Sequence, residues 1–587
     1  MSLCLKRLVR GHAEALSAVV LALGFAGCTE DEPGTRFEGQ AELWIATLDD
    51  GTERTRYVLA SPLGELGLEF ATPPEDLIGG ERIVVMGERI VGTGEREEND
   101  SIRVDSYQVL ERARDGVADM QSALTGNRTR TRLKVAVLMY HWGNQDSLTN
   151  ASMHEKIFTS QASLRQWYRE SSYGLVDIEG DVFGWYKVDK PSSGCGQDAA
   201  ANARSAARAK GVNLDAYDLW LHYFPRSSCG WSGLATVGRP FRPARNSYYN
   251  GASGCVTLAQ ETMHNLGGAH SRSYDCGNSA FSGSGCTEKT YGDPFDPMGH
   301  GCWQTSAFSK ATQAWFGKCN SVAVTANGSF DLVPIENPSD GIQMLQVRVK
   351  DSLCPTRIGS PCYYYVAYRQ RLGNVDGNQP ETAQIFKGLQ FHVGSAVDFE
   401  GGSAIKGPTL LDMTPTSSRG FDDPALEMGK TFTDPAGLKV TLVSSSAASA
   451  RVKLEFPGGG SGAPRCIDGS NPTGGDGGRD AGDGGPAADA GVPGKDGGSR
   501  PTDAGDVPQA DAGGSPQADA GDVPQADAGA PGTDGSGVSS DAGDAPQAAE
   551  GGCSCRVSST KERPSTLPAI LFLALFAFVM VRPSKPR

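Results

Sequence analysis

Apolar and polar residues alternate over short runs in the first part of the chain. The clearest runs are AELWIATL at 41–48, RIVVMGERIVG at 82–92 and IRVDSYQVL at 102–110, with glycine and charged turns between them. Period-2 alternation over such lengths is typical of half-buried strands. We therefore predict a small all-β domain over residues 37–115.

A basic segment at 126–132 (GNRTRTR) follows this predicted domain. A trypsin-like enzyme could cut there, as it would between a pro-domain and an enzyme. An ordinary accessory domain would be followed by the same kind of link. Both interpretations of residues 37–115 stay open on the sequence.

The pattern becomes mixed after the basic segment. LKVAVLMY at 133–140 and DLWLHYF at 218–224 are typical of buried strands, whereas residues 152–168 carry apolar side chains at roughly helical spacing. Residues 197–210 are rich in helix formers, and we expect a hairpin-like pair of strands over 171–188. This mixture predicts an α+β domain over residues 133–320.

Short alternating runs return after Asn327. They include FDLVPI, QMLQVRVK, CYYYVAYRQ, GLQFHVG, GLKVTLVSS and ARVKLEF, and the last ends at Phe456. Several short strands with turn signals between them predict a C-terminal β-sandwich over residues 325–456.

Residues 457–552 are an acidic Gly/Pro/Ala/Asp segment with almost no aromatic or branched side chains. Such a composition buries too little apolar surface to offset chain entropy, so we expect a disordered, self-repelling linker. It holds 16 acidic and 4 basic residues, which is −12 of the chain's net −15. The remainder is nearly neutral, and we expect no nucleic-acid partner.

The N-terminus has the pattern of an export signal. Basic residues precede an uncharged stretch, Ala15 to Gly27, that is too short to span a bilayer, and Cys28 follows. We predict a signal peptide over residues 1–28. Phe25-Ala26-Gly27-Cys28 resembles a bacterial lipobox, which would make Cys28 a lipid attachment site; simple cleavage is the alternative.

The C-terminus, residues 553–587, combines Cys553 and Cys555 with an apolar segment, Ser565 to Val581, and a basic end. These features resemble the myxobacterial C-terminal sorting signal, and a plain membrane anchor is the alternative. Either way the folded part would lie outside the cytoplasm, at the cell surface, on the outer membrane or released. Ten cysteines between Cys195 and Cys466 suit disulfides in an oxidising compartment, with buried free thiols as the alternative. Two pairs, Cys276–Cys286 and Cys354–Cys362, would close short loops.

Candidate chemistry is concentrated in QETMHNLGGAH at 260–270. We predict a helix over 256–266, on which Gln260 and His264 lie one turn apart on the same face. Gly267 can end this helix in a left-handed conformation and let His270 turn back towards the same ion. Three protein ligands leave a fourth position for water, which Glu261 can deprotonate as general base.

This segment resembles the zinc signature of the metzincin peptidases, HExxHxxGxxH, with Gln260 in place of the first histidine. YGDPFDPMG at 291–299 resembles their Met-turn, centred on Met298. With the flanking segments at 167–186 and 229–238, the closest resemblance is to the gametolysin family, whose algal members include enzymes with Gln in the first ligand position. The resemblance implies a metzincin-like fold and endopeptidase activity on extracellular proteins, with one catalytic Zn²⁺. An amide oxygen is a poorer zinc ligand than imidazole, so another divalent metal is possible.

Three functions follow from this pattern. The first is an exported zinc endopeptidase acting on protein or peptide substrates, with the membrane as a further partner. The second is an inactive peptidase-like surface binding protein, which Gln260 favours. The third is a structural spacer, which the acidic linker favours and the 260–270 motif does not. Among other side chains, His300 and Tyr291 are weaker candidates for the site, and Asp293 and Asp296 are expected to cap the loop. Four histidines are expected to be structural or solvated: His141, His154, His222 and His392.

Overall fold

The computed structural model describes residues 34–472, except 62–63, 75–76, 78, 91–99, 113–129, 318, 398–405 and 468. The predicted signal peptide at 1–28, the sorting signal at 553–587 and residues 473–552 of the acidic linker lie outside the described residues. The start of the predicted linker was placed wrongly, because residues 465–466 form a strand and Cys466 is held in a disulfide with Cys319. Among the helices that the structure describes, none combines the length and apolar character that crossing a bilayer requires.

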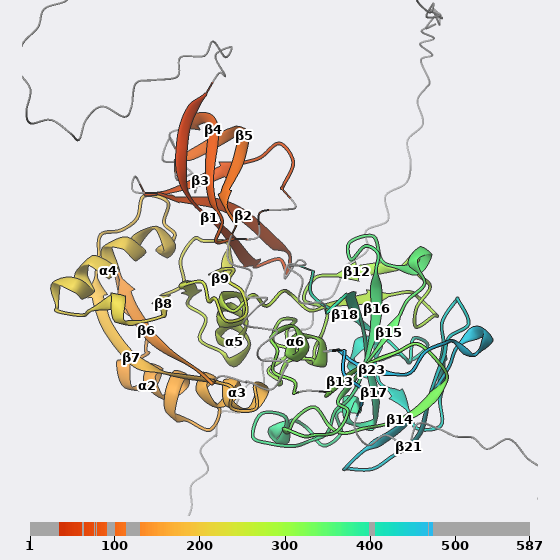
Figure 1. The fold of residues 1–587 in the computed structure, drawn as a ribbon. Helices are drawn as coiled ribbons and strands as arrows, with labels where there is room; N and C mark the ends of the chain where they lie inside the picture. Colours follow the sequence, from red (N-terminus) through yellow and green to blue (C-terminus); the bar gives the residue numbers. More distant parts are fainter. Residues whose placement is uncertain are drawn as a thin grey trace, which may run out of the picture. The chain divides into compact units, whose positions relative to one another are not determined.

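A ten-stranded sheet runs through the first half of the described chain (Figure 1). Its order is β2-β3-β5-β4-β1-β9-β10-β8-β6-β7. The strands are β1 (Thr35–Leu48), β2 (Glu53–Ser61), β3 (Gly64–Glu69), β4 (Arg82–Ile90), β5 (Ser101–Glu111), β6 (Thr131–His141), β7 (Val176–Lys187), β8 (Leu219–Phe224), β9 (Trp231–Thr236) and β10 (Asn246–Asn250).

Strand β1 joins the two parts of this sheet. Its first half pairs with β4, and Trp44 to Leu48 pair antiparallel with β9. The alternating runs predicted in the N-terminal part lie in β1, β2, β4 and β5, whereas β3 was not predicted. All five strands continue the sheet of the following segment. The division of the chain into separate domains stays a prediction.

The helices are short. They are α2 (Asn150–His154), the π-helix η1 (Glu155–Thr159), α3 (Leu164–Ser171), α4 (Ala200–Ala209), α5 (Cys255–Asn265) and α6 (Ala307–Thr312). Single 3₁₀ turns occur at η2 (Gly196–Ala199), η3 (Leu214–Ala216), η4 (Asp351–Leu353), η5 (Asp376–Asn378), η6 (Gln384–Lys387), η7 (Gly420–Asp422) and η8 (Pro457–Gly459).

Two local predictions in this region were wrong. The helix predicted over 152–168 is interrupted, because Ser160 is extended and Ser163 starts α3 as an N-cap that accepts a hydrogen bond from the Gln166 backbone N–H. The predicted strand pair over 171–188 is the single strand β7. Gly180 lies within that strand rather than in a turn, where a Cβ would meet the Val135 carbonyl oxygen at 1.8 Å.

The second half of the described chain forms two sheets. Their strands are β11 (Arg272–Asp275), β12 (Thr287–Lys289), β13 (Ser321–Val324), β14 (Gly328–Leu332), β15 (Met344–Arg348), β16 (Cys362–Tyr368), β17 (Gly388–Ser395), β18 (Thr409–Leu411), β19 (Leu426–Glu427), β20 (Thr431–Thr433), β21 (Lys439–Ser445), β22 (Ala450–Glu455) and β23 (Arg465–Cys466).

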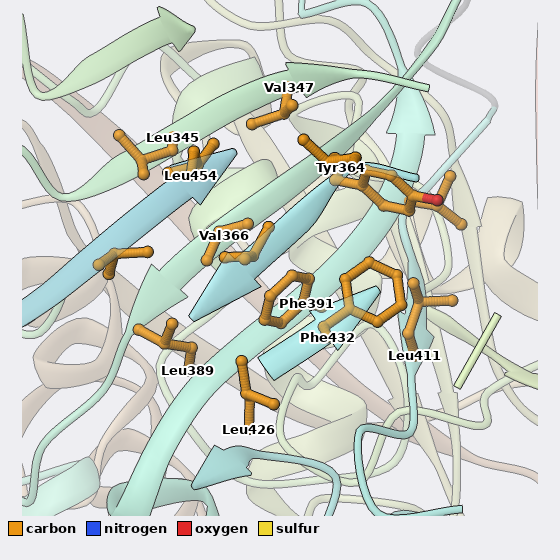
Figure 2. Close-up of a cluster of buried hydrophobic side chains, with 14 of the residues drawn as sticks. Leu345, Val347, Tyr364, Val366, Leu389, Phe391, Leu411, Leu426, Phe432 and Leu454 are labelled. Atoms are coloured by element: carbon orange, nitrogen blue, oxygen red, sulfur yellow. The ribbon is translucent and has the colours of Figure 1, made fainter. Parts of the chain in front are cut away.

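A nine-stranded sheet follows the path β12-β11-β18-β17-β16-β15-β13-β23, with β19 paired to β17, and a smaller sheet has the order β14-β22-β21-β20. Side chains from both sheets share one core (Figure 2): Val366 and Phe391 come from the larger sheet, and Phe432 and Leu454 from the smaller. Each of the six runs predicted after Asn327 contains a strand.

All ten cysteines between Cys195 and Cys466 form disulfides, which confirms the prediction from their number. The two proposed local pairs, Cys276–Cys286 and Cys354–Cys362, are both present. The other three pairs close longer loops: Cys195–Cys229, Cys255–Cys302 and Cys319–Cys466.

Candidate metal centre

Helix α5 (Cys255–Asn265) is present one residue earlier than the predicted helix over 256–266, and it carries Gln260, Glu261 and His264. One face of the helix packs Leu258, Ala259 and Met263 into a hydrophobic cluster, together with Met298. At its N-terminal end, the Cys255–Cys302 disulfide ties the helix to the loop that contains Met298. Gln260, Glu261 and His264 are all buried. Apolar packing and the disulfide therefore fix the position of the helix, and its three polar side chains lie in the protein interior.

The predicted turn after the helix is present. Gly267 has φ +88, and its backbone N–H donates to the His264 carbonyl while that of Gly268 donates to Met263. Only glycine adopts this backbone conformation readily, so Gly267 lets the chain reverse immediately. The reversal brings His270 back onto His264, with their Nε2 atoms 2.9 Å apart.

The Nδ1 atom of each histidine lies within hydrogen-bond distance of an oxygen that can only accept. His264 Nδ1 lies 2.8 Å from the Gly268 carbonyl oxygen, and His270 Nδ1 lies 2.6 Å from a carboxylate oxygen of Glu53. A carbonyl or carboxylate oxygen accepts only, so each Nδ1 carries the hydrogen. In a neutral ring the Nε2 atom then has a free lone pair.

Both rings are held in this neutral form. Burial lowers the pKa of His264 to about 3, and the neighbouring His270 adds to that shift. Burial also lowers the pKa of His270, although Glu53 opposes the shift. Two lone pairs therefore face each other across 2.9 Å, which is unfavourable unless a cation lies between them.

Gln260 lies one helical turn before His264. Its side-chain Nε2 donates to the Thr47 hydroxyl at 3.1 Å, a contact with strand β1. The structure thus brings His264 and His270 together directly, while the Gln260 amide is held on the β1 side of the same helix.

Glu261 is a buried carboxylate without a partner. Its side chain is fully enclosed, and neither oxygen has a hydrogen-bond partner among the described residues. Burial raises the pKa of Glu261 well above its usual range. The carboxylate rests on Gly233 of β9, where a Cβ would meet Glu261 Oε1 at 2.1 Å. A buried acid left unpaired is costly, which points to a site prepared for a ligand.

The His264 and His270 nitrogens are placed suitably for two ligands of one metal ion. Among the described residues, no three or more His, Cys, Asp and Glu side chains gather to hold a metal, so the predicted ligand set depends on the Gln260 amide as its third member. Two imidazole nitrogens on one tetrahedral zinc lie about 3.3 Å apart, so a small widening from 2.9 Å would admit the ion.

The loop that contains Met298 lies against the site. Met298 is fully buried, and its carbonyl accepts from the Ser271 backbone N–H at 2.8 Å. Asp293 and Asp296 accept from the backbone N–H groups two residues on, Phe295 and Met298, and so cap the loop as predicted. The Tyr291 ring centroid lies 4.2 Å from that of His270.

His300 does not reach the site from beneath. It is exposed, and its Nδ1 lies 2.6 Å from the Tyr291 carbonyl oxygen. Of the histidines expected to be structural, His222 is buried and stacked on Tyr248, and His392 is buried with Nε2 2.9 Å from Asp293. His141 and His154 pack beside Trp185 and Phe158.

Sequence reasoning missed Thr47 and Glu53. They lie more than 200 residues before their partners, on either side of the turn between β1 and β2. Burial would raise the pKa of Glu53, but the hydrogen bond from His270 and the hydrogen bond and positive charge of Arg272 outweigh burial and lower the value to about 2. No local motif marks either residue, because only the pairing of β1 with β9 places them.

Comparison with families of known proteins matches residues 132–323 to the family described as gametolysin peptidase M11. The match spans β6 to β10, helix α5, His270 and Met298, and it leaves out β1 to β5. No curated protein matches the chain. The match supports a peptidase over this segment, and such a family implies a metal cofactor.

Proposed function

We propose that the chain is an exported zinc-dependent endopeptidase that hydrolyses peptide bonds of extracellular proteins. One observation carries this proposal: the Nε2 atoms of His264 and His270 lie 2.9 Å apart, and Glu261 on the same helix is buried without a hydrogen-bond partner. The arrangement suits hydrolysis, in which a cation and a proton acceptor must act on one water.

Gln260, His264 and His270 would hold the ion, through the amide oxygen and the two Nε2 atoms. When bound, a divalent zinc supplies a Lewis acid for the scissile carbonyl and for the attacking water. Glu261 would accept the proton of that water at a carboxylate oxygen and return it to the leaving amine. Met298 and its loop support the site from below, as the Met-turn does in the metzincins that the sequence resembles.

Export has independent support. Five disulfides suit an oxidising compartment, and the N-terminal pattern suits a signal peptide. Anchoring by residues 553–587 or by lipid on Cys28 is part of the proposal and rests on the sequence alone.

The second candidate is a surface binding protein on a peptidase scaffold that has lost activity. Gln260 favours it, because an amide oxygen holds zinc more weakly than imidazole does. The retained Glu261 favours the enzyme, since a binding protein gains nothing from an unpaired buried carboxylate.

Digestion of casein and gelatin by the full chain separates the two candidates. The enzyme predicts cleavage that a chelator stops, that added zinc restores and that Glu261→Ala abolishes. Zinc binding with no cleavage by the parent chain would instead establish the binding protein.

Gln260→His tests the third ligand. If Gln260 binds the ion, imidazole at this position keeps or raises zinc affinity. A sharp fall in measured affinity would show that Gln260 is not a ligand.

A further inference from the structure

We propose that the N-terminal strands are a fixed part of the metal centre, with Glu53 as the positioning residue of His270 and Thr47 as that of Gln260. The inference rests on the proposed function, because it concerns the same ion. Both residues lie outside the segment that matches the peptidase family, so this role is not implied by the match.

Each predicted ligand has its second polar atom held by a neighbour. His264 uses the Gly268 carbonyl, from its own loop, whereas His270 and Gln260 use Glu53 and Thr47. Outer partners of this kind fix the orientation and tautomer of a ligand and raise its basicity. Two of the three are supplied by the N-terminal strands.

Glu53 is itself held in place. One carboxylate oxygen accepts from His270 Nδ1 at 2.6 Å, and the other accepts from Arg272, whose second nitrogen donates to Thr290. The carboxylate cannot turn without breaking a contact. It therefore fixes the plane of the His270 ring and keeps Nε2 directed at His264.

For Gln260, the hydrogen bond decides which amide atom faces the cation. Nε2 donates to the Thr47 hydroxyl, which leaves Oε1 for the ion. A neutral amide is a weak ligand, so a site that uses one gains most from having it oriented in advance.

The turn that carries both residues is anchored on each side. Residues 44–48 of β1 pair with β9, and the Asp49 backbone N–H donates to the Gly230 carbonyl at 3.1 Å. Asp49 also forms an ion pair with Arg226 at 2.6 Å. The hairpin is thereby fixed to the segment that carries the site.

Apolar packing adds to this attachment. Trp44 is buried, and its ring centroid lies 5.7 Å from that of Tyr248. It belongs to one hydrophobic cluster with Trp231 and Phe224. Removing β1 would expose these apolar side chains to water. This favours a strand that stays attached over one that is released.

The competing interpretation is a removable pro-domain, released by cleavage in the basic segment, for which Arg130 is exposed. The two interpretations predict opposite effects when the N-terminal contacts are lost. A positioning role makes loss of the N-terminal contacts weaken zinc binding, whereas a pro-domain makes their loss raise activity.

The test compares Glu53→Ala, Glu53→Gln and Thr47→Val in the full chain, with Glu88→Ala as the matched control. Glu88 is on β4, and its side chain is 72% exposed. Zinc affinity is measured by competition with a chromophoric chelator, and the cobalt-loaded chains are compared by their visible absorption. We expect Glu53→Ala to weaken zinc binding about 10–100-fold and to alter the cobalt spectrum.

We expect Glu53→Gln to weaken binding less, because its amide oxygen still accepts from His270 Nδ1, and Thr47→Val to weaken it severalfold. Glu88→Ala should bind zinc like the parent. If Glu53→Ala unfolds, Glu53→Gln and Thr47→Val carry the test.

Unchanged zinc affinity in the Glu53 and Thr47 variants would overturn the inference. So would faster cleavage by zinc-loaded Glu53→Ala, or by the chain after tryptic removal of the N-terminal strands. Affinity is measured without substrate. A parent chain that binds zinc through Glu53-dependent contacts but cleaves nothing would therefore remove the proposed peptidase and leave this inference standing.

Discussion

Two of the buried polar clusters in the described part of the chain differ in how completely they are paired. The arginine cluster consists of Arg369, Glu336, Asp376, Gln304 and Lys310. Arg369 donates to both carboxylates and to the Phe295 and Gln304 carbonyls. Lys310 donates to the Ser171 carbonyl and to the Gln304 side chain. Each charged group in this cluster has a partner.

The ligand cluster, Gln260, Glu261, His264 and His270, is equally buried and incompletely paired. Glu261 has no partner among the described residues, and the two Nε2 atoms face each other. Full pairing makes a buried cluster part of the architecture, whereas buried polar atoms left without a partner are consistent with a site for a ligand. Both clusters are buried, so the completeness of pairing, and not burial, distinguishes a candidate binding site from a structural cluster.

The largest expected effect is on catalysis by Glu261→Gln. The amide keeps the shape of the side chain and removes its basicity, so we expect kcat/KM to fall about 10³-fold. The melting temperature should not fall, because Glu261 makes no hydrogen bond that the variant would lose. A variant that loses activity and stability together would place Glu261 among the structural groups.

Arg369→Met should give the opposite result. It leaves Glu336 and Asp376 buried beside an apolar side chain, and we expect the free energy of unfolding to fall by about 3 kcal/mol. Denaturant unfolding measures this loss. Arg371→Met, at a half-exposed position two residues away, is the control and should cost under ~0.5 kcal/mol. Equal stability of the two variants would contradict the architectural role of the arginine cluster.

Gly233→Ala tests the ligand cluster from outside. The new Cβ would meet Glu261 Oε1 at 2.1 Å, and the flexible carboxylate would have to move. We expect activity to fall about tenfold, because moving a general base by even about 1 Å slows the reaction. The melting temperature should change little. Gly143→Ala, which meets nothing within 4 Å, is the control. Full activity in Gly233→Ala would mean that the Glu261 position is not critical.

The smallest expected effect concerns a carboxylate that is paired but only partly buried. Hydrogen bonds from Arg165, together with those from Arg169, lower the pKa of Asp177. A lowered pKa adds stability above the unfolded value of about 3.9, and this stability is lost as the pH falls below it. We expect Asp177→Asn to cost about 1 kcal/mol at pH 7, and the difference to shrink in acid.

Unfolding curves of parent and Asp177→Asn at pH 7 and pH 3 check this expectation. Glu179→Gln, on the same strand with a looser ion pair to Arg132 at 3.4 Å, should have a smaller effect at either pH. A difference for Asp177→Asn that grows in acid would contradict the assignment.

The predictable parts of the structure are those that local chemistry determines. Helix α5 and its end at Gly267 follow from residue spacing and from the freedom of glycine, and so does the return of His270 to His264. The pairs Cys276–Cys286 and Cys354–Cys362 are close in sequence, so chain geometry favours them.

Long-range pairing produced what the sequence did not reveal. Thr47 and Glu53 reach the ligand cluster only because β1 pairs with β9, a register set by contacts nearly 200 residues apart. The single strand β7 likewise depends on its parallel pairing with β6. The break at Ser160 is local, because Ser163 caps a new helix.

The most direct test of the shared metal site is the zinc content and X-ray absorption spectrum of the full chain, measured for the parent and for His264→Ala. A cation shared by Gln260, His264 and His270 predicts one zinc per parent chain, bound by nitrogen and oxygen at about 2.0–2.1 Å with imidazole scattering, and loss of that zinc in His264→Ala. A parent chain that retains no zinc, or a His264→Ala variant that binds it as tightly, would contradict the claim that Gln260, His264 and His270 share one cation.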